Sequence, residues 1–107
     1  MNSKEIKALI ADEHYRANQE HDPIFASNHE AYAVILEELC ETIDEVKEVD
    51  KQLQELWRNV RNDEPIGEIA DEAMNYVIKA IQEMVQVGAM LRKARLSENF
   101  RKESNNG

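Results

Sequence analysis

Acidic side chains at helical spacing are the residues of this sequence best suited to chemistry. Glu37, Glu38 and Glu41 form an E-E-x-x-E pattern, and Glu68 and Asp71 form an E-x-x-D pattern. Residues three or four apart share one face of a helix, so each pattern would present its carboxylates together. Converging carboxylates repel one another unless a cation lies among them. The sequence therefore predicts a metal site with ligands from both patterns: Glu38, Glu41, Glu68 and Asp71.

Oxygen ligands without cysteine or histidine at matching spacing favour Mg²⁺, with Mn²⁺ as the other possibility. No Glu-x-x-His pair occurs, which excludes the usual di-iron helical bundle. Mg²⁺ keeps several waters and takes substrate phosphates as further ligands, so a phosphate-bearing small molecule is the expected substrate. A water activated by the metal would be the nucleophile that attacks the phosphate. Glu37 or Glu45 is the expected base that takes its proton. Asn75 and Lys79 continue the stripe of Glu68 and Asp71, and they are the expected substrate-binding residues.

The same carboxylates have a simpler interpretation. The chain holds 22 acidic residues among 107, and an E-E-x-x-E match is then expected about once by chance. A solvated acidic face on a helix would look the same. The spacing of the carboxylates leaves both interpretations open.

Three helical segments must position these residues, and two proline-containing breaks separate them. The first covers residues 3 to about 20 with Ser3 as its N-cap, and the second runs from a capping box at Ser27 and Glu30 to about residue 61. Asp22-Pro23 and the segment 62–65 are the breaks. The third helix is expected from Pro65 to about residue 96, followed by a polar, frayed tail at 97–107.

These segments predict an all-α fold, with two long antiparallel helices and a shorter N-terminal helix forming a single domain over residues 1–96. Each long helix would extend roughly 48 Å, far beyond the radius of gyration of about 13 Å expected for a compact chain of this length. The apolar residues of the third helix cover more than half of its circumference, and its small residues, Gly88 among them, would allow close approach of another backbone. We therefore expect oligomerisation to complete the helical bundle.

The antiparallel arrangement creates a register problem for the two acidic patterns. Glu41 lies about 22 residues before the centre of the turn between the long helices, whereas Glu68 lies only about five after it. The patterns can meet within one chain only if the second helix breaks or packs so that its first half returns past Glu68. Otherwise they meet across a subunit boundary.

Composition limits the partners and the compartment. A formal net charge of -9 argues against binding nucleic acid. No apolar run of 18 residues and no signal-peptide core are present, so neither a membrane span nor secretion is expected. Cys40, the one cysteine, cannot form an intrachain disulfide and is predicted to be a small buried hydrophobe. These features predict a cytoplasmic protein.

Two stretches resemble a known family. Residues 27–41, SNHEAYAVILEELCE, and residues 80–93, AIQEMVQVGAMLRK, are similar to small MazG-like proteins of the all-α nucleoside triphosphate pyrophosphohydrolase superfamily, especially short forms from Gram-positive bacteria and their phages. The resemblance covers roughly residues 25–95. Glu37, Glu38 and Glu41 match the first half of the family's carboxylate signature, and Glu68 and Asp71 match the second half.

The resemblance implies Mg²⁺ binding by these carboxylates, cleavage of a nucleoside triphosphate to the monophosphate and pyrophosphate, and assembly into a homodimer or homotetramer. Together with the spacing of the carboxylates, it predicts a Mg²⁺-dependent nucleotide pyrophosphohydrolase. The alternative is a non-catalytic helical adaptor that binds partners through the surplus apolar face of the third helix.

Overall fold

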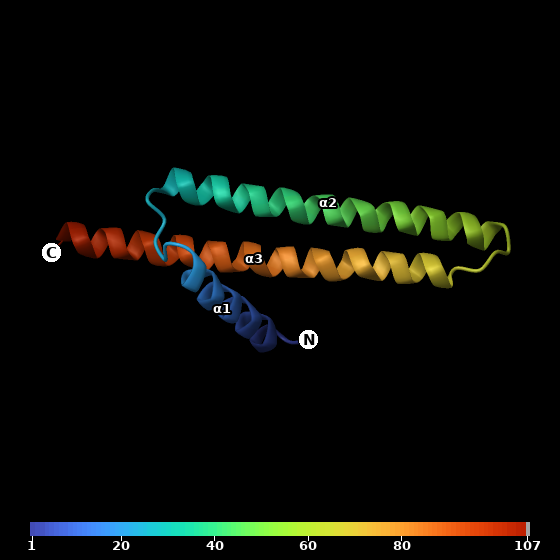
Figure 1. Ribbon diagram of the computed structural model, residues 1–107, viewed down its shortest axis with the longest axis horizontal. Coiled ribbons are helices and arrows are strands. Elements are labelled where there is room, and N and C mark those ends of the chain that lie inside the picture. The colour runs from blue at the N-terminus through green and yellow to red at the C-terminus, as the bar shows by residue number, and fades with distance from the viewer. Residues whose placement is uncertain (107) are drawn as a thin grey trace. The chain divides into compact units, whose positions relative to one another are not determined.

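The computed structural model describes residues 1–106, with side chains for residues 1–104, and consists of three helices (Figure 1). They are α1 (Ser3–Glu20), α2 (Asn28–Arg61) and α3 (Gly67–Asn106). Residues 1–106 contain no strand. The predicted all-α class, the number of helices and the two breaks are confirmed.

Local caps begin the first two helices. The side chain of Asn2 accepts a hydrogen bond from the Glu5 amide at 2.9 Å, so Asn2 and not Ser3 is the N-cap of α1. Both residues are good caps; the bounds of α1 agree with the predicted segment, and only the capping residue differs, by one position. The Ser27 hydroxyl accepts from the Glu30 amide at 3.1 Å, which confirms the predicted cap of α2.

The third helix is longer than the sequence predicted. We expected it to end near Leu96, but α3 continues to Asn106. Its extension is held by tertiary hydrogen bonds: the buried Ser97 hydroxyl accepts from the Phe25 amide at 2.8 Å, and Arg101 donates to the Phe25 carbonyl at 2.9 Å. A polar segment that looks weakly helical by itself is stabilised by such contacts. Gly107, the last residue of the predicted tail, lies outside the described residues.

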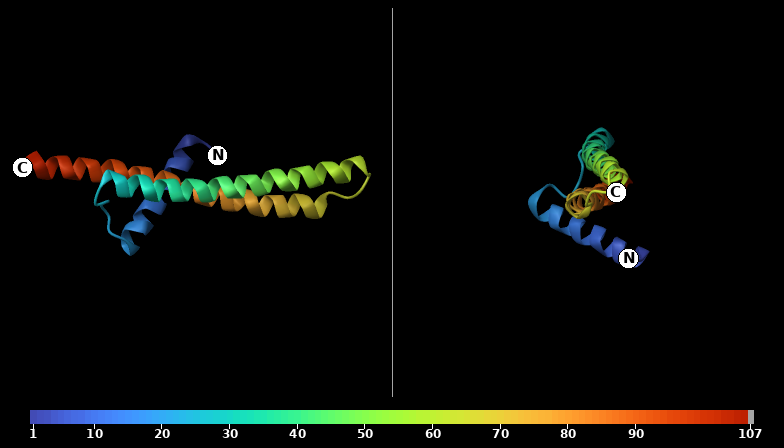
Figure 2. Two further views of the ribbon diagram at one scale, coloured as in Figure 1. Left: turned by 90° about the horizontal axis from the view of Figure 1, so that it is seen from above. Right: turned by 90° about the vertical axis from the view of Figure 1, so that its right-hand side faces the viewer.

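The chain divides into two compact units, and residues 1–39 and 84–107 form unit 1. In unit 1, α1 crosses the C-terminal half of α3 (Figure 2). The crossing is close at Gly88, where an added Cβ would lie 2.8 Å from Ile10 Cδ1, as expected for a small residue at a helix contact. The buried apolar side chains of the described residues all belong to this unit: Ala17, Phe25, Ala31, Val87 and Ala89.

Unit 2, residues 40–83, is an antiparallel helical hairpin, as predicted, and its two arms lie side by side in Figures 1 and 2. Asp63 takes a positive φ of 52° in the connecting turn, a conformation that aspartate tolerates better than most residues. Asn59 stabilises the turn by donating a hydrogen bond of 2.7 Å from its side chain to the Pro65 carbonyl. The units share α2 and α3, and the predicted single domain over residues 1–96 stays a prediction.

The described residues contain no helix that combines the length and the apolar character needed to cross a bilayer.

Candidate functional site

Two carboxylates from different helices meet in unit 2. Glu41 on α2 and Glu83 on α3 each offer a carboxylate oxygen, and these oxygens lie within 4.8 Å of each other. Glu41 is exposed and Glu83 is half-buried. The antiparallel course of the hairpin brings them level, although 42 positions separate them in the sequence.

Glu38 lies one turn before Glu41 on the continuous helix α2. Its carboxylate oxygen is also within 4.8 Å of that of Glu41, as expected for side chains three residues apart on a helix. We call Glu38, Glu41 and Glu83 the carboxylate cluster. The sequence predicted the first two members together and missed Glu83.

The cluster suits a hard cation. Glu83 Oε2 is buried and accepts no hydrogen bond from the residues that the structure describes. A buried carboxylate oxygen without a partner is costly, and a divalent cation would satisfy it. Carboxylate oxygens are the ligands that Mg²⁺ and Mn²⁺ prefer, so the cluster fits the predicted metals.

The other two predicted ligands lie elsewhere on the hairpin. Glu68 is in the first turn of α3, 15 positions before Glu83, and Asp71 is one turn further along; both are exposed. Fifteen residues of α-helix correspond to roughly 22 Å. Because α2 is unbroken from Asn28 to Arg61, the break that could have joined the two patterns within one chain does not occur. The four predicted ligands therefore do not assemble within a single chain.

The predicted catalytic and substrate-binding residues differ in how close they lie to the cluster. Glu45, half-buried, follows Glu41 by one turn, and Lys79 precedes Glu83 by one turn, so both lie about 6 Å from the cluster toward the hairpin turn. Asn75 is a further turn away along α3, and Glu37 is exposed, about 100° around α2 from Glu38. Lys79 is exposed, and its ammonium lies 5.4 Å from the centre of the Tyr76 ring.

Unit 1 contains a pocket of about 490 Å³ between α1, the 21–27 loop and the nearby parts of α2 and α3. Lys93, 7% exposed, lies with its ammonium 4.3 Å from the centre of the buried Phe25 ring. The carboxylates that line the pocket outnumber its lysine and arginine side chains; the full lining is Glu13, Arg16, Ala17, His21, Asp22, Phe25, Glu30, Val34, Glu38, Gln86, Met90 and Lys93.

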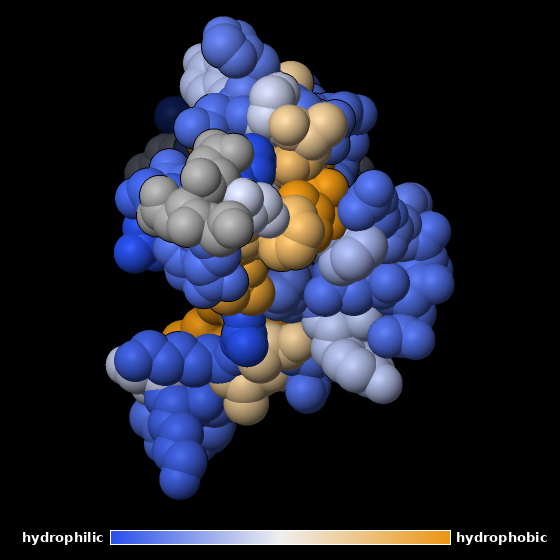
Figure 3. Space-filling view, turned by 90° about the vertical axis from the view of Figure 1, so that its left-hand side faces the viewer, coloured by the Kyte–Doolittle hydropathy of each residue, from blue (hydrophilic) through white to orange (hydrophobic). Residues whose placement is uncertain are grey.

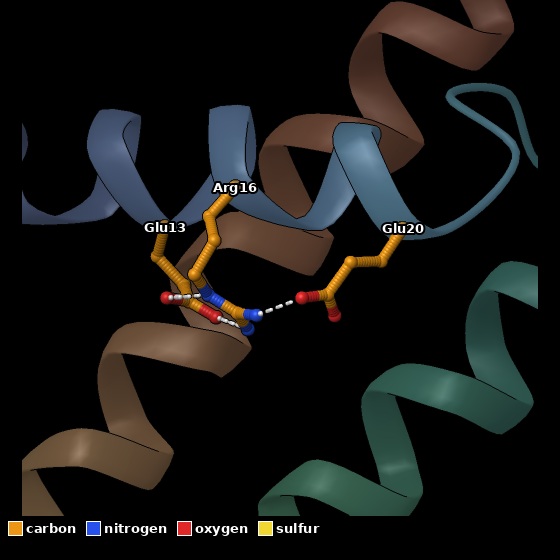
Figure 4. Close-up of polar contacts among 3 residues, drawn as sticks. All are labelled: Glu13, Arg16 and Glu20. Carbon is orange, nitrogen blue, oxygen red and sulfur yellow. Dashed lines mark hydrogen bonds and ion pairs between the residues drawn. The ribbon is translucent and has the colours of Figure 1, made fainter.

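Arg16 at the edge of this pocket is already paired with two carboxylates of α1 (Figure 4). It donates two hydrogen bonds to Glu13, one of them 3.0 Å long, and one of 3.1 Å to Glu20. The hydrogen bond from Arg16 lowers the pKa of Glu13, and the same contact raises the pKa of Arg16. Arg16 is therefore poorly placed to bind an external anion.

His14 is a buried titratable group on α1, only 5% exposed. Burial lowers its pKa from the usual 6.5, and the positive charges of Arg92 and Lys93 on α3 lower it further. We therefore expect His14 to be neutral at pH 7. His14 is not a member of the carboxylate cluster.

Many large apolar side chains remain exposed, and apolar side chains reach the surface among hydrophilic ones on the face drawn in Figure 3. Cys40 is also exposed, so the prediction that it is buried was wrong; two positions before the buried Thr42, it lies about 160° around α2 from that side chain.

No protein-family model, curated protein or solved structure matches this chain.

Proposed function

We propose that this protein is a divalent-cation-dependent nucleotide pyrophosphohydrolase that cleaves a nucleoside triphosphate to the monophosphate and pyrophosphate. It would act as a cytoplasmic homodimer or homotetramer with Mg²⁺, or Mn²⁺, as its cation. The observation that carries the proposal is the meeting of Glu41 and Glu83, with Glu38 one turn away. The family resemblance of residues 25–95 supplies the reaction class.

In this proposal, Glu38, Glu41 and Glu83 hold the cation. When bound, Mg²⁺ would polarise the phosphoryl oxygens of the substrate and neutralise the charge that develops on them. Glu68 and Asp71 lie too far along α3 to join this group within one chain, so they could act as ligands only from a second chain.

Two further side chains have proposed roles one turn from the cluster. Glu45 accepts a proton from the water that attacks the α phosphorus; the bond to the bridging oxygen breaks, and pyrophosphate leaves. Lys79, level with Glu45 on the opposite arm of the hairpin, contacts the phosphate oxygens. Of the two predicted bases we favour Glu45, because it is half-buried and lies only about 20° around α2 from Glu38. Glu37 is equally close to Glu41 in spacing, but it is exposed and lies about 100° around the helix from Glu38.

The test is pyrophosphate release from a panel of canonical and modified nucleoside triphosphates, with Mg²⁺ and with a chelator. Glu41→Gln and Glu83→Gln should each lower turnover by more than about 100-fold, because losing a direct ligand costs more than the 10–100-fold lost when a residue that only hydrogen-bonds to a ligand is changed. Asp44→Asn is the matched control, since Asp44 is an exposed carboxylate of α2 outside the cluster. Full turnover in Glu83→Gln would remove this cluster from the mechanism.

Asp71→Asn separates the two ligand sets. Unchanged turnover in this variant would leave Glu38, Glu41 and Glu83 as the whole site. A loss comparable to that of Glu41→Gln would mean that a second chain supplies Asp71.

The second candidate function is the non-catalytic adaptor. The observation that favours it is the exposure of large apolar side chains in unit 2, such as Leu53 at 60% and Trp57 at 59%. If no triphosphate in the panel releases pyrophosphate while the purified chain remains helical, the adaptor becomes the better account.

A further inference from the structure

Within unit 2, helix α2 turns a largely polar row of side chains toward α3. These residues recur at spacings of three and four and are buried or half-buried: Thr42, Glu45, Val49, Gln52, Leu56 and Asn59. We call them the inner row. Only two of the six are apolar, so α2 does not use its most hydrophobic face to pack against its own hairpin partner.

The more apolar row of α2 lies one residue further on, about 100° around the helix, and is exposed. We call it the outer row: Ile43, Val46, Asp50, Leu53, Trp57 and Val60. Its five apolar members are 43%, 54%, 60%, 59% and 44% exposed, in that order. A helix normally buries its most apolar stripe. The outer row is not covered within this chain, so its partner surface must come from another molecule.

The same displacement occurs on α3. Its half-buried residues in unit 2 include Ala73, Val77 and Ala80, whereas Met74, Ile78 and Ile81 are 57%, 49% and 49% exposed. In two antiparallel helices that face each other, advancing one residue turns both side chains toward the same side of the pair. The outer row and these three α3 side chains therefore share one face of the hairpin, which we call the outer face.

The outer face has the size of a protein interface. Its eight large apolar side chains are about half exposed and so present roughly 600 Å² in one copy, most of the ≈ 800 Å² that each partner contributes to a standard interface. Among the described residues of unit 2 no apolar side chain is fully buried; Thr42 is the one buried residue. An exposed apolar patch of this extent marks an interaction site.

When the outer row is placed against a reversed copy of itself, apolar side chains lie opposite apolar side chains at four of its six positions. An isologous interface requires that residue i contacts residue j while j contacts i. If two copies of α2 run antiparallel about an axis level with the peptide between Lys51 and Gln52, Ile43 lies against the partner's Val60. Val46 then lies against the partner's Trp57. Both pairs are apolar, and the spacing is that of an antiparallel coiled-coil seam.

We propose that the outer face binds a second copy of this chain, with the two α2 helices antiparallel about this axis. The proposal names the interface of the homo-oligomer in the proposed function, on which it rests. The two proposals can fail separately, because the interface is tested by the molecular mass of the assembly, whereas the reaction is tested by the release of pyrophosphate.

One residue in the seam opposes the contact. Asp50 occupies the centre of the outer row, where it would lie against the partner's Leu53, and its carboxylate accepts a hydrogen bond of 3.0 Å from Gln54 of its own chain. A charge at a seam position costs stability while helping to select one alignment. Removing it should therefore tighten the dimer.

The experiment is sedimentation equilibrium on the full chain over a range of concentrations. We expect a dimer or larger assembly, conversion to monomer by Leu53→Glu, and at least a tenfold lower dissociation constant in Asp50→Leu. Tyr32→Glu is the matched control, because Tyr32 is a 68% exposed apolar residue on α2 outside unit 2. A wild-type monomer, or an assembly that Leu53→Glu leaves intact, overturns the proposal.

Cysteine cross-linking tests the orientation in a Cys40→Ser background. The pair Val46→Cys and Trp57→Cys in one chain should form covalent dimers through two intermolecular disulfides. Val46→Cys alone should not, because the two copies of residue 46 would lie roughly 16 Å apart along the seam and disulfides need Cα atoms within about 7 Å. Efficient cross-linking by the single cysteine, with none from the pair, would contradict the antiparallel arrangement.

Discussion

Substituting Gly88 by alanine tests the close contact between α1 and α3 in unit 1. A Cβ at this position would lie 2.8 Å from Ile10 Cδ1, 3.0 Å from Cγ1 and 3.3 Å from Cγ2. All three atoms belong to one side chain, so Ile10 must move, or α1 must shift, to make room. The half-buried Ile10 has neighbours of its own and cannot move without cost.

Two opposing effects decide whether Gly88→Ala raises or lowers the free energy of unfolding. Overpacking of this kind costs about 1–3 kcal/mol, while replacing glycine by alanine within a helix gains about 1 kcal/mol in helix propensity. Gly88→Ala should therefore destabilise the protein by roughly 0–2 kcal/mol. In an Ile10→Ala background the clash is gone, and the same substitution should stabilise by about 1 kcal/mol.

The assay is urea unfolding followed by circular dichroism for the four chains of this double-mutant cycle at one protein concentration. The two measured effects of Gly88→Ala should differ by about 1–3 kcal/mol. Gly67→Ala is the control, since no atom lies within 4 Å of the added Cβ and its effect should be the same in both backgrounds. Equal effects of Gly88→Ala with and without Ile10 would refute the close contact as the cause.

Three further predictions concern pH, buried hydrogen bonding and metal binding. Because the folded pKa of His14 lies below its ordinary 6.5, the unfolded chain binds more protons below that pH; stability should fall as pH drops from 6.5, and His14→Gln should flatten this slope in pH-dependent melts. Ser97→Ala leaves the buried Phe25 amide without its acceptor and should cost about 1–3 kcal/mol by urea unfolding, with no loss if water replaces the hydroxyl. Millimolar Mg²⁺ or Mn²⁺ should raise the melting temperature relative to a chelator, and Glu83→Gln should abolish the rise; an equal rise in that variant would place the cation elsewhere.

The helices could be predicted because their signals are local. The cap at Ser27, the breaks before Pro23 and Pro65, and uninterrupted apolar periodicity act within a few residues, and the helices begin and end close to the predicted positions at all of them. The end of α3 could not be found this way. Its last turns depend on Ser97 and Arg101 bonding to Phe25, more than 70 residues earlier in the chain.

The residues of the candidate site also fall into those that local spacing predicts and those that depend on tertiary packing. Glu38 and Glu41 were recognisable because three-residue spacing places them on one face of any helix, whatever the rest of the chain does. Glu83 was not, because its proximity to Glu41 depends on where the hairpin turns and how its arms are aligned. For the same reason, Glu68 and Asp71, which match Glu38 and Glu41 as a motif, lie roughly 22 Å and 18 Å from Glu83 along α3.

Three helices, their order and the acidic character of their surfaces follow from the order of residues alone, because propensity, capping and periodicity are properties of neighbouring residues. Which carboxylates meet and which face of α2 is covered depend on how the helices pack. In unit 2 the more polar row packs inward, and the apolar row of Val46, Leu53 and Trp57 stays exposed. Periodicity shows that a helix has an apolar face; it does not show whether the same chain or another covers it.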